Sequence, residues 1–381
     1  MRIAPLLALP LLGTLVAAWA QAPAGSADSP RVPTAPVGQA SQTDRPPAQT
    51  PTVPTDHPQA ATSRKFDFRY AVSVAEIPRE ARTLRLWIPV PPSNGQQEVT
   101  GLSLKSPVSW EMRRQGDGRN RVAFLEIDPR KLKAPLSVEM RFTAERRENR
   151  ANLSGGPRPT AGEAPPDLAR YLRPDRLVPL DGVIADLAKQ QTATLDRPLQ
   201  KARAIYDYVL STMKYDKTGE GWGRGDAIYA CNVRKGNCTD FHALFIGMMR
   251  AAGIPARFEI GFPLPRDRSA GEIAGYHCWA QFWIDGRGWV PVDASEGWKD
   301  PARRDYFFGA HDANRVLFTE GRDLRLDPPQ QGEPLNFFVY PYAELDGKPW
   351  SGWKASYSFQ DVGPAAASAG VGTPRETRAG S

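Results

Sequence analysis

One cysteine of the chain stands where a reactive thiol is favoured, at the predicted start of a helix. Cys238 follows Asn237, a residue that commonly caps helix N-termini, and apolar side chains then recur at helical spacing up to Gly253. A thiol at this position lies at the positive end of the helix dipole, which lowers its pKa and favours the nucleophilic thiolate. Cys238 is therefore a candidate nucleophile, although a cysteine in this pattern alone is more often a packed apolar side chain.

A histidine and an aspartate further along the chain supply the partners that such a thiol needs. Residues 275–295, GYHCWAQFWIDGRGWVPVDAS, have the alternation of a β-hairpin. If its loop comprises residues 285–287, Asp293 lies on the same face as His277, one diagonal step away, whereas a two-residue loop places them on opposite faces. A cysteine nucleophile needs a basic partner, and that imidazole needs an acceptor for its other nitrogen. We therefore predict a catalytic set of Cys238, His277 and Asp293.

Four other residues near these motifs are candidates for roles around the catalytic set. The indole N–H of Trp222 is a candidate donor to an oxyanion, and a plain role as a loop residue that covers the cleft is the alternative. Trp279, His242 and Trp298 are candidates for lining a substrate cleft. His242 lies on the same helical flank as the nucleophile, but no carboxylate is evident to orient its ring. We therefore interpret His242 as a packing or substrate-side residue.

The chain has three cysteines, Cys231, Cys238 and Cys278, so at least one thiol is unpaired within the monomer. By strand alternation, Cys278 points away from His277 and into the core. We expect Cys238 to be free, and Cys231 and Cys278 to be either bonded to each other or both buried thiols. Together with His242 these residues include zinc-type ligands, but their spacing matches none of the usual finger or ribbon patterns. We therefore predict no metal and no cofactor.

The start of the chain has the composition of an export signal. Residues 1–20 combine a basic start at Arg2, an apolar run and a small-x-small end at Ala18–Ala20. Residues 21–63 and 363–381 are rich in small and polar side chains and predict a disordered tether and a disordered tail. We expect a periplasmic or secreted protein with no integral membrane segment after cleavage of residues 1–20.

The charge of the chain gives no sign of a nucleic-acid partner. Its formal net charge is +7, but the basic residues are scattered and form no run interleaved with aromatic side chains. We interpret this charge as a solvated surface and exclude a nucleic-acid partner.

The pattern between the two ends predicts two folded domains. Residues 64–150 contain four runs that alternate between apolar and polar side chains and predict a small antiparallel, sandwich-like β domain: 66–74, 84–88, 122–127 and 136–143. Helical patterns at about residues 181–194 and 198–213 open the catalytic domain, which we place at residues 167–362.

Three segments of this catalytic domain closely resemble the core of the transglutaminase-like superfamily of cysteine enzymes: GNCTDFHALFIGMMRAAGIPARFEIGF, GYHCWAQFW and GWVPVDAS. The resemblance covers about residues 180–300 and has its Cys, His-x-Trp and Asp blocks in the same order. It implies a papain-like α+β fold in which the cysteine helix packs on an antiparallel sheet. It also implies acyl transfer through a thioester. Calcium sites of the animal enzymes are not evident, so the resemblance is to the bacterial, often hydrolytic, members.

From these observations we expect an exported cysteine peptidase or amidohydrolase that cleaves peptide or isopeptide amides. Its partner is a peptide or protein substrate, with cell-wall peptide as one candidate. One alternative is true protein-glutamine transglutamination, in which an amine outcompetes water at the thioester. The other is a non-catalytic module that binds cell wall or protein.

Overall fold

The computed structural model describes residues 63–115, 118–132, 134–153 and 167–363. The predicted signal segment, the tether before Ser63 and the tail after Gly363 lie outside these residues, so they stay predictions. No helix within the described ranges is long and apolar enough to cross a membrane.

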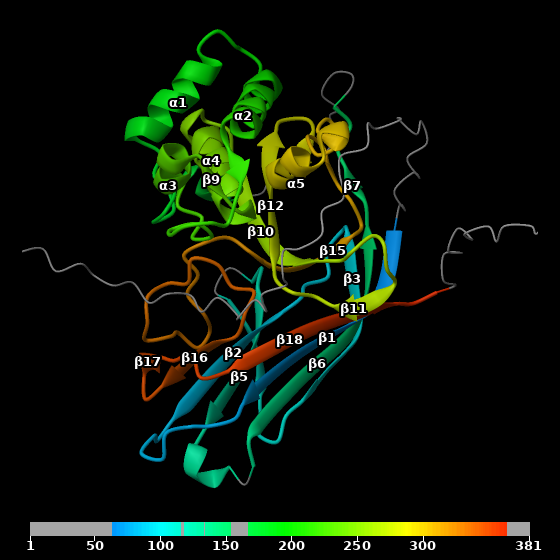
Figure 1. Ribbon diagram of the computed structural model, residues 1–381, viewed down its shortest axis with the longest axis vertical. Coiled ribbons are helices and arrows are strands. Elements are labelled where there is room, and N and C mark those ends of the chain that lie inside the picture. Colours follow the sequence, from blue (N-terminus) through cyan, green and yellow to red (C-terminus); the bar gives the residue numbers. More distant parts are fainter. Residues whose placement is uncertain (1–62, 116–117, 133, 154–166, 364–381) are drawn as a thin grey trace, which may run out of the picture. The chain divides into compact units, whose positions relative to one another are not determined.

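Two five-stranded sheets form a β layer (Figure 1). The strands of the first sheet, in spatial order, are β11 (Ala270–Glu272), β18 (Lys354–Asp361), β1 (Ser63–Val74), β6 (Leu136–Arg147) and β3 (Gln97–Lys105). Those of the second are β17 (Lys348–Pro349), β16 (Tyr342–Leu345), β2 (Leu84–Val90), β5 (Arg121–Ile127) and β4 (Glu111–Arg114). All neighbouring strands in both sheets run antiparallel.

Alternating side chains explain why the first part of the chain folds this way. In β1 the apolar residues Phe66, Phe68 and Tyr70 are buried, and the polar residues between them are exposed or half-buried. The four predicted strands of residues 64–150 correspond to β1, β2, β5 and β6, which confirms them. Strands from the end of the chain complete both sheets, since β18 pairs with β1 and β16 pairs with β2. The predicted catalytic range of residues 167–362 therefore also contributes strands to the β layer.

A four-stranded antiparallel sheet supports the cysteine helix. Its order is β13 (Gly288–Val292), β12 (His277–Ile284), β10 (Ala256–Pro263) and β15 (Arg315–Glu320). The helix α4 (Cys238–Ala251) contacts β12 and β10, and every residue from Cys238 to Arg250 is buried. This arrangement confirms the predicted α+β class, with the cysteine helix packed on an antiparallel sheet.

Other helices enclose α4 (Figure 1). They are α1 (Gly182–Thr192), α2 (Pro198–Thr212), α3 (Ala227–Val233) and α5 (Ala294–Lys299). The first two confirm the helices predicted from periodicity, within two residues at each end. The helix α3 follows a glycine-rich loop, residues 219–225, and Asp226 caps it by accepting the backbone N–H groups of Ile228 and Tyr229.

Short elements connect these layers. They are the strands β7 (Asn149–Arg150), β8 (Lys214–Tyr215), β9 (Lys235–Gly236) and β14 (Ala310–His311), and the 3-10 helices η1 (Pro129–Lys131), η2 (Leu168–Leu172) and η3 (Pro301–Arg303).

Aromatic packing joins the β layer to the four-stranded sheet. The ring of Phe68 in β1 lies 5.6 Å from Phe262 of β10 and 5.7 Å from Phe318 of β15, between centroids. Tyr70 is 5.6 Å from Phe318 and donates its hydroxyl to the carbonyl of Val339. The β layer thus supports β10, which pairs with β12, and β15, which pairs with β10.

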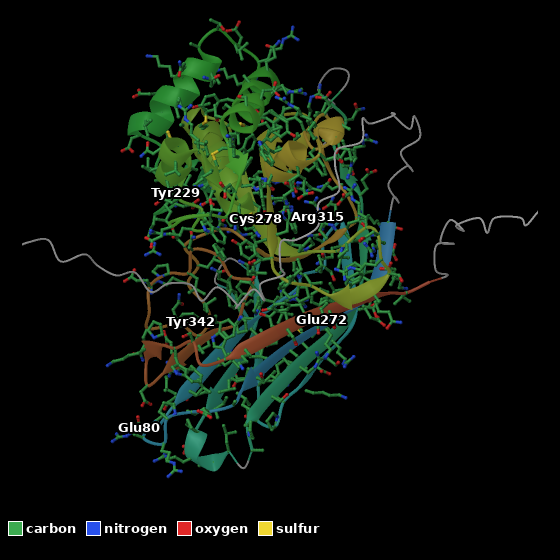
Figure 2. The ribbon with its side chains drawn as sticks, viewed as in Figure 1. Glu80, Tyr229, Glu272, Cys278, Arg315 and Tyr342 are labelled. Atoms are coloured by element: carbon green, nitrogen blue, oxygen red, sulfur yellow. The ribbon has the colours of Figure 1, made fainter. Side chains whose placement is uncertain are left out.

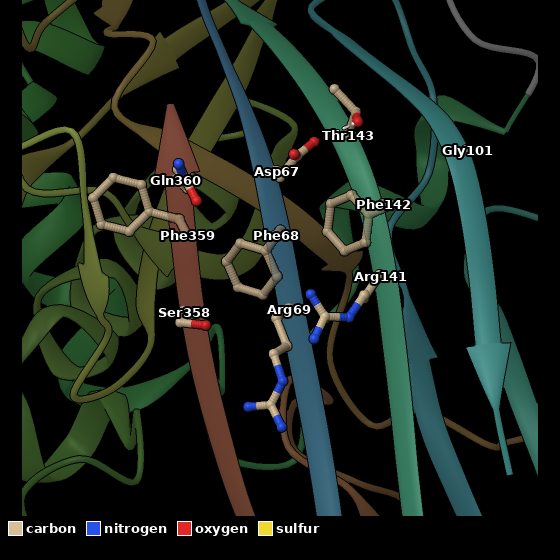
Figure 3. Close-up of a pocket in the computed structure, with 10 residues that line it drawn as sticks. All are labelled: Asp67, Phe68, Arg69, Gly101, Arg141, Phe142, Thr143, Ser358, Phe359 and Gln360. Carbon is tan, nitrogen blue, oxygen red and sulfur yellow. Dashed lines mark hydrogen bonds between the residues drawn. The ribbon is translucent and has the colours of Figure 1, made fainter. Parts of the chain in front are cut away.

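The first sheet also carries a hollow of about 320 Å³ over β1, β6 and β18 (Figure 3). Arg69 and Arg141, which line it, both bond the carboxylate of Glu139. None of the predicted catalytic residues lines this hollow.

Candidate active site

The start of α4 holds the candidate nucleophile in a fixed position. Asn237 precedes the helix, and its side chain accepts the backbone N–H of Thr239 at 2.9 Å. The carboxylate of Asp240 accepts the backbone N–H of Asn237 at 2.9 Å, which completes a capping box. Cys238 is the first helical residue and is 2% exposed, so the thiol lies at the helix start as predicted.

The hairpin of β12 and β13 has the register that the catalytic set requires. Ala280 pairs with Val292 and Ile284 with Gly288, which leaves residues 285–287 as the loop. This confirms the odd loop length. It also brings His277, the first residue of β12, next to Asp293, the residue that follows β13. The Nε2 atom of His277 is 2.7 Å from Oδ2 of Asp293.

The carboxylate of Asp293 is completely buried and surrounded by donors. Besides His277, its Oδ2 accepts Nη1 of Arg315 at 3.0 Å. Its Oδ1 accepts the hydroxyl of Ser295 and the backbone N–H of Glu296, each at 3.0 Å. Burial alone raises a carboxyl pKa, but the charge and hydrogen bond of His277 and the charge of Arg315 outweigh burial and hold the pKa of Asp293 well below its usual range. Asp293 is therefore an ionised acceptor that orients the imidazole.

The thiol and imidazole form a coupled pair. With Nε2 engaged by Asp293, the Nδ1 atom of His277 is the one left for the side-chain hydrogen bond to Cys238. Burial lowers the pKa of His277, but Asp293 and Cys238 reverse this effect and raise it to about 9. Burial likewise raises the pKa of Cys238, but hydrogen bonds from Cys278 and His277 lower it well below its usual value. The pair is thus a thiolate and an imidazolium near neutral pH.

The second histidine, His242, has no nitrogen left for the thiol. Its Nδ1 is 2.8 Å from the carbonyl oxygen of Cys238, and its Nε2 accepts the backbone N–H of Ala294 at 3.1 Å. These contacts assign the proton to Nδ1, and burial lowers the pKa of the ring, so His242 is neutral. The side chain is completely buried, which agrees with the packing role and leaves no surface for a substrate.

The thiol of Cys278 lies beside the nucleophile, which sequence reasoning missed. Cys278 is completely buried, as expected, but its backbone N–H and its thiol both hydrogen-bond the Cys238 sulfur. Its Sγ is also 3.6 Å from Nδ1 of His242. Strand alternation does turn Cys278 away from His277. Cys278, labelled in Figure 2, lies on β12, the strand against which α4 packs. All three cysteines are free and buried. This is the state expected of Cys238. For Cys231 and Cys278 it is one of the two expected states, in which both are buried thiols.

The three tryptophans occupy different surroundings. The indole of Trp222 donates to the carbonyl of Gly219 at 3.1 Å, so in this structure its donor is used within the loop. Trp279 is completely buried and donates to Glu259, so it offers no surface to a cleft. Trp298 is half-buried against Phe241, with 6.2 Å between ring centroids, and keeps some exposed surface.

Two residues that position the nucleophile were not singled out from the sequence. Besides capping α4, Asp240 accepts the backbone N–H groups of Gly223 at 2.7 Å and Gly225 at 3.0 Å, which fixes the glycine-rich loop beside Cys238. The hydroxyl of Tyr276 accepts the side-chain amide of Asn237 at 2.9 Å. Two features of the sequence could have indicated these residues: Asp240 lies in the first turn of the predicted helix, and Tyr276 directly precedes His277.

The side chains of the site do not form a metal centre. Within the described ranges, no group of three or more His, Cys, Asp or Glu side chains is arranged to hold a metal ion. The arrangement can instead present a buried thiolate, a proton carried by His277, and a carboxylate that holds the imidazole in place.

Comparison with known proteins gives a family for this part of the chain. Residues 185–294 match the transglutaminase-like superfamily core. An uncharacterized protein of Haemophilus influenzae is 33% identical over 215 residues, which cover 48% of this chain and 58% of that protein. The uncharacterized protein YebA of Bacillus subtilis is 25% identical over 134 residues, or 32% of this chain and 18% of that protein. The chain thus spans less than two thirds of either relative.

A solved structure shares the fold over most of the chain. It is that of a candidate cysteine protease from Cytophaga hutchinsonii, with a TM-score of 0.52 and 17% sequence identity. The likeness covers 79% of this chain and 99% of that chain. At this identity the likeness shows the fold alone.

Proposed function

We propose that this protein, a member of the transglutaminase-like superfamily through residues 185–294, is an exported cysteine enzyme that cleaves peptide or isopeptide amides. The observation that carries the proposal is the connected set of Cys238, His277 and Asp293, with the thiol at a helix start and the imidazole bonded to a buried carboxylate. Export is inferred from the predicted signal segment of residues 1–20.

In the proposed reaction, Cys238 first takes up the acyl group and later releases it, and His277 first gives up a proton and later recovers one. The Cys238 thiolate attacks the carbonyl carbon of the amide, and the carbon–nitrogen bond breaks as the imidazolium of His277 transfers its proton to the departing amine. The acyl group remains on Cys238 as a thioester. Neutral His277 then removes a proton from water, the hydroxide attacks the thioester, and the acid leaves while the ion pair re-forms. Asp293 stays ionised throughout and keeps the imidazole oriented.

The oxyanion of the tetrahedral intermediate needs donors close to Cys238. At the start of α4 the backbone N–H groups of Thr239 and Asp240 already bond Asn237, so the N–H of Cys238 itself is the first candidate. The indole of Trp222 is a second candidate, and its N–H must leave the carbonyl of Gly219 to take part.

The test compares two cysteine variants on a library of peptide and isopeptide amides. Cys238→Ala is expected to abolish release of the amine, whereas Cys231→Ala keeps the wild-type rate, because Cys231 is a buried thiol whose pKa burial raises. Melting curves of both variants check that the fold is intact. Equal loss in the two folded variants contradicts the assignment of the nucleophile.

Two further readouts separate the proposal from its alternatives. Incubation with a labelled primary amine tests transfer, since Cys238-dependent incorporation of label in place of hydrolysis indicates transglutamination. Alkylation by iodoacetamide tests catalysis as such. If Cys238 reacts no faster than a model thiol near neutral pH, a non-catalytic binding module explains the chain better.

A further inference from the structure

Two cysteine side chains lie next to each other at the start of α4. Cys278 of β12 is completely buried, and its thiol hydrogen-bonds the sulfur of Cys238. The Sγ atom of Cys278 is also 3.6 Å from Nδ1 of His242, one turn further along α4, so β12 presents this thiol to the helix at two points. The proposed reaction uses only one of the two sulfurs.

The proton of Cys278 is directed at the sulfur of Cys238. The Nδ1 atom of His242 cannot accept this proton, because it carries one of its own and donates it to the carbonyl of Cys238 at 2.8 Å. Burial and the hydrogen bond to Cys238 raise the pKa of Cys278 well above its usual value, so Cys278 stays a thiol. A thiolate therefore lies in contact with a protonated thiol.

Cys238 is the cysteine that an oxidant attacks first. Hydroperoxides react with thiolates, whereas buried protonated thiols are inert. Burial opposes ionisation of Cys238, but hydrogen bonds from Cys278 and His277 hold its pKa well below the usual value. A sulfenic acid on Cys238 would thus form in contact with the thiol of Cys278, and a sulfenic acid condenses with a thiol to a disulfide.

The third cysteine is not placed to take part. Cys231 lies in α3, where burial raises the pKa of its thiol and Arg234 lowers it, with no contribution from either of the other two cysteines. Cys278 is therefore the thiol that is positioned to react with an oxidised Cys238.

We infer that Cys238 and Cys278 form a reversible oxidation site, in which a hydroperoxide oxidises Cys238 and Cys278 then closes a disulfide with it. The disulfide inactivates the nucleophile in a form that a thiol reductant restores, whereas further oxidation to sulfinic acid is not reversed by such a reductant. This inference requires the thiolate of Cys238 and not the cleavage of amides, so it goes beyond the proposed function.

The two steps balance with a hydroperoxide as the only oxidant. In the first, the Cys238 sulfur attacks a peroxide oxygen, a sulfur–oxygen bond forms, the oxygen–oxygen bond breaks, and the imidazolium of His277 protonates the departing oxygen. Hydrogen peroxide thus yields the sulfenic acid and water. In the second, the Cys278 sulfur attacks the Cys238 sulfur, the sulfur–oxygen bond breaks, and the hydroxide leaves with the proton of Cys278 as a second water. The two sulfurs together lose two electrons, which reduce the peroxide.

The experiment treats the purified protein with an excess of hydrogen peroxide. It follows the intact mass, the position of any disulfide in the peptides, and the alkylation of Cys238 by iodoacetamide. Wild-type protein is expected to become two hydrogen atoms lighter and to carry a disulfide between Cys238 and Cys278. Dithiothreitol should then restore the alkylation of Cys238 to its rate before treatment.

Cys278→Ser removes the second sulfur and keeps a side chain that can donate a hydrogen bond. Its Cys238 is expected to gain oxygen atoms up to sulfinic acid, and dithiothreitol should restore only about a tenth as much reactive thiol as in wild type. Cys278→Ala takes its place if serine disturbs the buried site, and each variant is compared with its own untreated sample. Cys231→Ser is the matched control and is expected to form the disulfide and recover as wild type does.

Three results would overturn the inference. They are a wild-type mass that stays unchanged or rises, a disulfide that joins Cys231, and a recovery of Cys278→Ser equal to that of wild type. In each case, turnover that depends on Cys238 before peroxide treatment leaves the proposed function standing. Conversely, a protein that forms the reversible disulfide but cleaves no amide before treatment removes the proposed function alone.

Discussion

Replacing Asp293 with asparagine tests whether the carboxylate sets the protonation state of the catalytic pair. The side chain keeps nearly the same size, so the buried site is not emptied. However, the charge is lost, and the carboxylate accepts all four of its hydrogen bonds, from His277, Arg315, Ser295 and the backbone of Glu296. The amide nitrogen of asparagine must face two of these donors. If the amide nitrogen faces His277, it donates to Nε2 of the imidazole. The ring then carries its proton on Nδ1, the nitrogen toward Cys238.

The expected loss can be worked out from the pKa of the imidazole. Asp293 is the main group that raises the pKa of His277 from 6.5 to about 9 against the effect of burial. A rise of this size corresponds to about 3 kcal/mol of preference for the protonated ring, or about 300-fold in the ratio of the ion pair to the neutral pair. Asp293→Asn should therefore lower kcat/KM at neutral pH about 100-fold or more, because the neutral ring with its proton on Nδ1 cannot accept the proton of the Cys238 thiol.

The assay is the pH dependence of kcat/KM between pH 5 and 10, with the rate of iodoacetamide alkylation as a second readout. In wild-type enzyme the ion pair is lost as His277 gives up its proton near pH 9, whereas in Asp293→Asn this loss moves to lower pH. Asp285→Asn, in the loop of the same hairpin, is the control with the same chemical change at an exposed position. An activity within threefold of wild type and an unchanged alkaline limb would refute the reasoning.

Three further outcomes follow from the structure. In wild-type enzyme, alkylation of Cys238 should stay fast from mildly acidic pH up to the pKa of His277, about 9. Above that pH the imidazolium loses its proton and no longer contributes. A single rise in rate near the pKa of an ordinary thiol would contradict the ion pair. Asp240→Asn should lower the free energy of unfolding by about 2 kcal/mol, measured in urea, because at least one buried backbone N–H loses its acceptor. Gly261→Ala should cost about 3 kcal/mol or more, or prevent folding, because the added Cβ would stand 1.8 Å from the carbonyl oxygen of Val316.

Controls for the two stability variants come from the same chain. Gly95→Ala introduces the same methyl group where no atom lies within 4 Å, so it should leave the melting temperature nearly unchanged. For Asp240→Asn, the exposed Asp285→Asn serves again. An unfolding free energy of Gly261→Ala equal to that of Gly95→Ala would show that β10 and β15 adjust at this point.

The parts of the site that depend on local pattern were predictable from the sequence. The cysteine helix has its cap, its apolar spacing and its glycine stop within about twenty residues, and α4 forms as expected. Likewise the hairpin has a period of two, so the length of its loop alone decides whether His277 and Asp293 share a face. The structure has the loop that places them together.

The parts that depend on distant partners were not predictable in this way. Strands β16 and β18 pair with β2 and β1 across more than 200 residues, and no local pattern records which edge a strand joins. Alternation correctly turned Cys278 toward the core, but it does not say that the core face of β12 meets the start of α4. The same limit applies to Asp240, whose place in the helix was clear while the loop that it holds was not.

A buried arginine connects the carboxylate of Asp293 to a second buried carboxylate, Asp312. Arg315 is 2% exposed and bonds Asp293 through Nη1 and Asp312 through Nη2. A buried cation is tolerated only with compensating charge, and here two carboxylates share that task. Because the charge of Arg315 is divided between Asp293 and Asp312, it neutralises Asp293 only in part, and the rest of the charge of Asp293 acts on His277.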